Sequence, residues 1–370
     1  MASIASHAAR MAAPLLAALW IAAPVSVEAQ QTKILTADKH NEYGLVYTLP
    51  LTALEVEVTA VRTVRKAGPY YQYARKYIGT EKVVTEDSEQ WTIEDVRVTP
   101  VGVPDPEARY LMQLKSGSPT YIGVAEDGML LSVNARPLEQ AQTTSELVQP
   151  EQEVFADKEY LQYVGGDFLA SQSKAKQAQM LAEGLMEIRE SKVSLTRGTA
   201  DQMPTDGRQL ELMLNSLAHQ EGALTAAFVG TVSSERVRRT FTFTPDEEGR
   251  SVLFRMSDFS GFVDADDYSG DPVYVDVKVT GQATMPVDSK GEEKKFPKDG
   301  VAYCIPGTAR ISLSLLGNPL WERELEIAQY GVVFGLDPRL FNDRKQPSYA
   351  RFNAATGALE EFGQATDLNE

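Results

Sequence analysis

The densest cluster of side chains that could do chemistry is a run of four carboxylates: Asp264, Asp266, Asp267 and Asp271. Proteins hold calcium with several oxygen ligands at short spacing in a loop, so this run is the strongest candidate for a metal site. An EF-hand loop needs glycine at its sixth position, which is Ser269 when counted from Asp264. We therefore expect the aspartates to cap a tight turn, with calcium as the alternative, and assign no metal ligand.

Histidine and cysteine, which provide many catalytic bases and nucleophiles, are scarce. The chain has three histidines (His7, His40 and His219), with no nucleophile motif beside them, and it lacks HExxH, CxxC and a glycine-rich phosphate loop. Cys304 lies in an alternating apolar run, which predicts a small buried side chain. A carboxylate pair for glycoside hydrolysis cannot be chosen among 52 acidic residues. We assign no catalytic residue and no cofactor.

Three tyrosines, Tyr70, Tyr73 and Tyr77, fall along one side of a short segment. Pro69 suits a first helical position and Gly79 a helix end, which predicts a helix of two to three turns. Such a tyrosine face could stack on a sugar or a peptide. We expect it instead to pack on the sheet beside it, because tyrosine is favoured both in cores and at interfaces.

The long helical part of the chain lies between residues 171 and 230. Apolar residues at helical spacing predict one helix over residues 171–191 and a second over residues 207–229. Asp206 is the expected N-cap of the second helix, and Gly230 its C-terminal glycine. A loop of about ten residues predicts that the two helices form an antiparallel hairpin, which we interpret as packing and spacing.

Glu221 interrupts the apolar stripe of the second helix, between Leu217 and Leu224. A carboxylate that faces a core needs a cation as its partner. Arg189 on the first helix is one candidate, but the hairpin as predicted puts it roughly 20 Å from Glu221 along the helix axis. We therefore expect a cation from a β region, with Arg189 as the alternative.

Both flanks of the helical part are rich in strand patterns. Apolar and polar residues alternate over residues 54–60 and 273–279, and Asp127-Gly128 is a strong hairpin signal. The predicted fold is α+β and mainly β, with two sandwich-like or open-barrel regions joined by the helical hairpin. Their predicted bounds are an N-terminal β-rich region with one short helix (30–135), a linker (136–156), the hairpin (157–230) and a C-terminal β-rich region (231–370).

The linker should be an early site of proteolysis, since residues 136–153 contain no aromatic residue and are rich in Gln, Glu and Thr. Residues 1–29 have the pattern of a secretory signal peptide. Arg10 precedes an apolar run, and Val27 and Ala29 suit cleavage after Ala29.

No later segment is long and apolar enough to span a bilayer, so we expect an exported protein of the periplasm or cell surface. The net charge of −16 disfavours nucleic acid and anionic membranes as partners. A single cysteine cannot form an internal disulfide.

Several stretches resemble the domain-of-unknown-function family 4831. They are Leu49-Pro50, the run AGPYYQYARKYIG at 67–79, residues 188–191, 220–225 and 228–230, the run VDADDYSG at 263–270, and residues 341–343. Tyr268 and Asp271 stand where Leu and Glu are expected. The resemblance implies a secreted or periplasmic protein of Gram-negative bacteria, and it brings no catalytic or binding residue with it.

Taken together, these patterns favour a non-enzymatic envelope protein that binds another protein or a surface polymer. The alternative is a hydrolase or accessory factor that acts on glycans or peptides. A deep pocket with clustered titratable residues would favour the enzyme, and a flat patch rimmed by aromatic residues would favour the binding protein.

Overall fold

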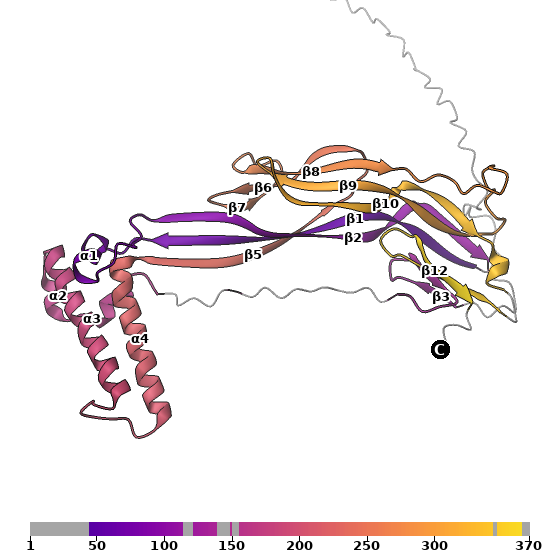
Figure 1. The fold of residues 1–370 in the computed structure, drawn as a ribbon. Coiled ribbons are helices and arrows are strands. Elements are labelled where there is room, and N and C mark those ends of the chain that lie inside the picture. Colours follow the sequence, from indigo (N-terminus) through magenta and orange to yellow (C-terminus); the bar gives the residue numbers. More distant parts are fainter. Residues whose placement is uncertain (1–43, 114–120, 139–148, 150–154, 343–345, 365–370) are drawn as a thin grey trace, which may run out of the picture.

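The computed structural model describes residues 44–113, 121–138, 149, 155–342 and 346–364. The predicted signal peptide and most of the predicted linker lie outside these ranges. Within them the protein is mainly β, as the sequence predicts, and its strands form three antiparallel sheets. Figure 1 shows an elongated molecule with the sheets gathered toward one end and the long helices at the other.

The first sheet has the order β2-β1-β5 and contains β1 (Gly44–Lys66), β2 (Ser88–Gln113) and β5 (Thr231–Phe243). The second has the order β10-β9-β8-β6-β7, with β6 (Gly249–Ser257), β7 (Gly261–Val263), β8 (Asp271–Gly281), β9 (Val301–Leu315) and β10 (Asn318–Leu336). The third has the order β12-β11-β4-β3, with β3 (Ile122–Val124), β4 (Leu130–Val133), β11 (Ser348–Phe352) and β12 (Leu359–Gln364).

The long helices are α3 (Lys174–Arg197) and α4 (Gly207–Val229). The short ones are α1 (Ala74–Tyr77), α2 (Gly166–Ala170) and the 3₁₀ helices η1 (Tyr71–Tyr73), η2 (Glu159–Tyr163) and η3 (Pro338–Leu340). No helix in the described part of the chain is long and apolar enough to cross a membrane.

The largest core lies between the first and second sheets. Val56 and Val58 of β1 are buried together with Ile311 of β9, as expected for strands that alternate between core and solvent. Phe241 of β5 stacks on Phe254 of β6 with ring centroids 4.2 Å apart. This arrangement agrees with the predicted alternation and gives two sheets that share one apolar interior.

Strands from before and after the helices share two of the three sheets. β1 pairs with β5 from Leu54↔Phe243 to Lys66↔Thr231, and β4 pairs with β11. The expected division into an N-terminal and a C-terminal β-rich region is therefore not how the sheets are assembled. Strand partners are chosen by packing between residues far apart in sequence, and a local pattern carries no information about that choice.

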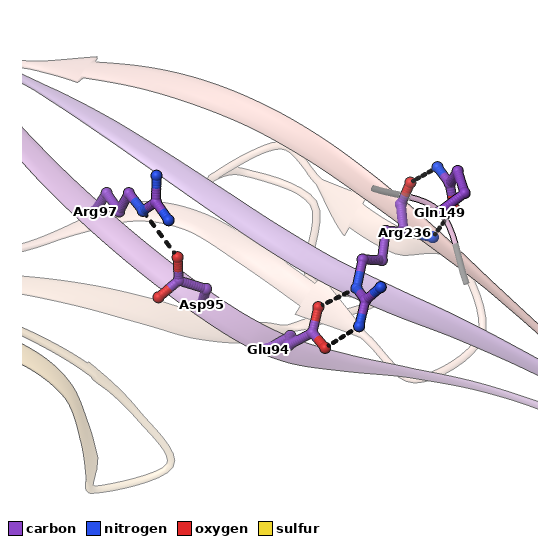
Figure 2. A network of polar contacts seen from close by, with 5 residues as sticks. All are labelled: Glu94, Asp95, Arg97, Gln149 and Arg236. Atoms are coloured by element: carbon purple, nitrogen blue, oxygen red, sulfur yellow. Dashed lines mark hydrogen bonds and ion pairs between the residues drawn. The ribbon is translucent and has the colours of Figure 1, made fainter. Parts of the chain in front are cut away.

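Two glutamine side chains act as short strand partners. The amide of Gln329 accepts from the Thr52 backbone N–H and donates to the Thr52 carbonyl, both at 2.9 Å, where β1 meets β10. Gln149 makes the same pair of bonds with the Arg236 backbone at the edge of β5, at 2.9 and 2.8 Å. Figure 2 shows the Arg236 guanidinium reaching the opposite way, onto both carboxylate oxygens of Glu94 on β2. The Arg236–Glu94 pair thus joins the two outer strands of the first sheet, β5 and β2. We call this three-stranded sheet the ribbon.

The helices are attached at one end of this ribbon. The last residue of β1, Lys66, pairs with the first residue of β5, Thr231, while Arg65 pairs with Ser88 at the start of β2. The Tyr70 backbone N–H then donates to the Ala227 carbonyl at 3.0 Å, which ties the segment after β1 to α4. The ribbon therefore positions the helices (Figure 1).

Candidate functional site

The helical end contains one carboxylate held by two cations of α3. Arg189 Nε lies 2.7 Å from Glu221 Oε1, and Lys192 Nζ lies 2.8 Å from Oε2. These hydrogen bonds, the one from Lys192 foremost, hold the pKa of Glu221 below its usual value. The expectation of a cation from a β region is therefore wrong, and the alternative partner Arg189 is correct, with Lys192 beside it.

The reason is the length of α3. It runs to Arg197 and ends at Gly198, whose φ of 71° is the left-handed conformation that glycine adopts at little cost. Arg189 is thus eight residues from the end of α3, while Glu221 is fourteen residues from the start of α4. The offset along the axis is about 9 Å rather than 20 Å, and an arginine side chain can cover much of it.

The apolar stripe of α4 is covered unevenly. Leu224 and Phe228, at the end near the ribbon, are 1% and 0% exposed and pack in the helical core. Leu210, Leu214 and Leu217, nearer the tip, are only half-buried. An apolar stripe normally faces a partner along its whole length. The tip of the hairpin therefore presents an apolar surface that the described chain covers in part.

A cleft of about 740 Å³ opens at this tip, between α3, α4 and the loop that joins them. We call it the tip cleft. Its lining combines serine and threonine hydroxyls, a small apolar floor and three carboxylates, contributed by Glu187, Glu190, Ser191, Ser194, Leu195, Thr199, Ala200, Asp201, Met213, Ser216 and Leu217. A concave surface with a few polar groups around an apolar floor is the usual form of a binding site.

The chemistry of the tip cleft favours a cationic, partly apolar ligand. The carboxylates of Glu187, Glu190 and Asp201 surround it, and the described residues that line it include no lysine, arginine or histidine. Met213 is 39% exposed, and methionine adapts its shape to irregular partners. Hydroxyl groups of the lining can donate to or accept from a ligand.

The tyrosine segment contributes to packing. The predicted helix is shorter than expected, formed by η1 and α1, and Gly79 follows it with a φ of 78°. Tyr70 is 5% exposed and lies 6.1 Å from the Phe228 ring and 6.2 Å from the Phe168 ring. The tyrosines therefore pack on helices, not on the sheet that we expected, and the interpretation as packing holds.

Three of the four aspartates, Asp264, Asp266 and Asp267, lie in the predicted turn, and Asp271 begins β8. The Asp267 carboxylate accepts from the Ser269 backbone N–H at 2.9 Å, and this bond holds the pKa of Asp267 below its usual value. Asp264 lies 3.8 Å from the Arg239 guanidinium. Among the described residues no three His, Cys, Asp or Glu side chains are grouped so as to hold a metal ion.

The other candidates for chemistry take structural positions. Cys304 is buried in β9 as predicted, and burial raises the pKa of its thiol to about 12. His219 Nε2 lies 2.5 Å from a carboxylate oxygen of Glu159 on η2, and the His219 ring packs beside Phe155. His40 lies outside the described residues.

Sequence patterns did not point to the tip cleft. No catalytic or metal motif predicted its carboxylates, and Leu217 lies on the apolar stripe of the second helix, which we expected to pack. One signal was available: the predicted apolar stripe of the second helix, from Leu210 to Phe228, is longer than that of the first, from Ala178 to Ile188. When two helices pack and one apolar stripe is longer than the other, the extra length of the longer stripe is left partly uncovered.

Comparison with known proteins gives a family and no function. A search of curated proteins and a search of solved structures each found no significant match. The model of one family matches residues 43–360, which includes all three sheets up to the start of β12 and both long helices. The chain therefore belongs to the family described as Domain of unknown function (DUF4831).

Proposed function

We propose that this protein is an exported, non-enzymatic binding protein whose helical hairpin captures another protein at the tip cleft. The observation that carries the proposal is the α4 stripe, which is buried at Leu224 and half-buried at Leu217, where the cleft opens. An apolar surface left open beside polar groups is typical of an interaction site. In this proposal the hairpin links the β-sheet parts of the chain and holds the cleft away from them.

The partner that fits best presents a basic amphipathic segment. Three carboxylates attract and orient a cationic partner, while Leu217 and Met213 offer contact for apolar side chains. Helices that lay one apolar face into a groove are a common form of peptide recognition. Binding of this kind weakens as salt is added, because exposed charges are screened.

Export is part of the proposal and rests on the sequence of residues 1–29. We expect processing after Ala29 and residence in the periplasm or at the cell surface of a Gram-negative bacterium. Amino-terminal sequencing of the envelope fraction should begin at Gln30. An intact Met1 in that fraction would contradict export by this route.

The binding proposal can be tested with two synthetic peptides of equal length. One forms an amphipathic helix with leucine on one face and lysine on the opposite face. The other has the same sequence with glutamate in place of lysine. The lysine peptide should bind the full chain at low salt and the glutamate peptide should not. A Glu187→Lys/Glu190→Lys variant should lose the lysine peptide, whereas Glu322→Lys, on β10 in the sheet body, should keep it. Equal binding by both variants would reject the tip cleft as the site.

The same experiment separates the alternative function. Three carboxylates in one cleft are also the residue type that glycoside hydrolases use. A hydrolase would turn over a glycan or peptide substrate and would lose that turnover in Glu187→Gln or Glu190→Gln. A binding protein retains bound peptide intact, which mass spectrometry of the recovered peptide can show.

A further inference from the structure

Tyr268, on the loop between β7 and β8, has an exposed ring that a neighbouring arginine holds in place. It lies far in sequence from the residues of the tip cleft. Tyr268 is 86% exposed, and the Arg255 guanidinium lies 4.5 Å from the centroid of its ring. Arg255 itself donates to the Ala265 carbonyl at 2.8 Å and to the Gly270 carbonyl at 3.1 Å. One face of the ring is therefore supported by a cation that both ends of the loop hold in place.

The rest of the loop is also ordered by its own hydrogen bonds. The Asp267 backbone N–H donates to the Asp264 carbonyl at 3.0 Å, and the Asp267 carboxylate accepts from the Ser269 N–H. A ring that is oriented before a ligand arrives costs less conformational entropy on binding. The open face of Tyr268 is thus preorganised for a flat contact.

A second exposed ring lies at the same end of the sheet. Phe259, 78% exposed, sits in the turn between β6 and β7, where the Ser257 hydroxyl accepts from the backbone N–H of Phe259 and of Ser260. β8 begins beside the last residues of β6, since Met256 pairs with Asp271. The turn that carries Phe259 precedes β7 and the loop that carries Tyr268 follows it, so both adjoin the edge of the second sheet that β7 forms.

The carboxylates on the Tyr268 loop accept hydrogen bonds. The two guanidinium groups near them are already engaged, Arg255 with the Ala265 and Gly270 carbonyls and Arg239 with Asp264. Asp264, Asp266 and Asp267 are exposed on the Tyr268 loop, and an ionised carboxylate is an acceptor with no donor. A ligand that suits them must donate hydrogen bonds and must not carry negative charge. A ligand that suits the rings must present a flat apolar face.

We propose that this edge binds neutral oligosaccharides, with a pyranose ring stacked on Tyr268 and its hydroxyls donated to the neighbouring aspartates. A pyranose has both properties, because its C–H bonds form an apolar face and its hydroxyls point outward as donors. An acidic sugar would be repelled by the carboxylates. The site is separate from the tip cleft and does not depend on the function proposed for it.

Calorimetric titration of the full chain tests this proposal with cellohexaose, maltohexaose, laminarihexaose and chitohexaose as neutral probes and a galacturonic acid hexamer as the acidic one. At least one neutral hexaose should bind, Tyr268→Ala should weaken that binding by about tenfold or more, and Tyr268→Phe should retain it. Tyr121→Ala, which removes another exposed tyrosine, is the matched control and should leave binding unchanged.

Three results would overturn the proposal. They are no binding of any neutral hexaose up to about 10 mM, equal effects of Tyr268→Ala and Tyr121→Ala, or binding of the acidic hexamer as tight as that of the best neutral one. Binding of the lysine and leucine peptide that depends on Tyr268, without sugar binding, would assign the edge to proteins instead. Tyr268→Phe keeps the test sound if the alanine variant disturbs the loop.

Discussion

The helical end and the sheet body solve the same problem, burial of polar groups, in different ways. In the sheet body the backbone groups of Thr52 meet the side-chain amide of Gln329, a neutral partner that completes the pairing. In the helical end the charged Glu221 is surrounded by Arg189 and Lys192, and it stays 23% exposed. Neutral pairing tolerates full burial, whereas a charge retains access to water unless its desolvation is fully compensated. The helical end thus keeps a charged group in contact with water, whereas the sheet body, formed by the three sheets, buries its polar groups in neutral pairs.

The largest expected effect is in the sheet body. Phe254→Ala removes a side chain that is 1% exposed and stacked on Phe241, and should lower the free energy of unfolding by about 3–5 kcal/mol. Trp91 and Trp321 pack against this core, so their fluorescence reports its urea-induced unfolding. A loss below about 1 kcal/mol would show that the sheets do not depend on this core.

Leu185→Ala tests whether the helical end unfolds separately. Leu185 is 0% exposed in the helical core, and its truncation should cost about 2–5 kcal/mol, less than Phe254→Ala if the half-open end relaxes. The transition followed by helical circular dichroism should move, while the tryptophan transition should stay in place. Equal shifts in both signals would mean that the two regions unfold as one unit, which would contradict separate unfolding of the helical end.

A double-mutant cycle tests the charge cluster. Arg189→Met and Glu221→Gln should each destabilise the hairpin, with a coupling energy of about 1 kcal/mol because the ion pair is half-exposed. Arg62→Met and Glu89→Gln form a comparable exposed pair on the ribbon and serve as the control cycle. If the effects of Arg189→Met and Glu221→Gln are additive, the two side chains have no coupling energy and the ion pair does not stabilise the hairpin.

Acid should weaken the helical end by a smaller amount. The pKa of Glu221 is lowered in the folded chain, so its stabilisation is complete above the usual glutamate value of 4.5 and is lost as the pH falls through the lower folded value. The native protein should melt at a higher temperature than Glu221→Gln at neutral pH, and this difference in melting temperature should shrink as the pH falls to about 3. A constant difference across this range would contradict the assignment.

Local features of the fold were predictable from the sequence. The Asp206 carboxylate accepts from the Gln209 backbone N–H at 2.7 Å as an N-cap should, and Gly128 turns the β3–β4 hairpin with a φ of 88°. Val273, Val275 and Val277 lie in β8 with their side chains buried, as the alternation predicts. Each of these depends on neighbours within a few residues, which is the range that pattern analysis covers.

Features set by distant contacts were not predictable. β2 runs from Ser88 to Gln113 through Pro100 and Pro104, with a register shift against β1 between Pro104 and Arg109. Proline is tolerated there because β2 lies at the edge of its sheet, a position known only once the strand order is known. The tip cleft has the same origin, since residues of α3, α4 and the loop between them form it together and no single motif contains them.

The long ribbon gives the molecule a mechanical character. β1 alone has 23 residues, or roughly 75 Å at the rise of an extended strand, and β5 pairs with it up to Lys66. A partner that pulls on the helices along the ribbon places β1, β2 and β5 under tension together, because all three strands join the helical end. The load is then shared by three strands, and no hydrogen bond between them is peeled apart. A pull across the ribbon would open these hydrogen bonds one after another. A tether of this design resists extension far better than peeling, and its strength depends on the direction from which the partner pulls.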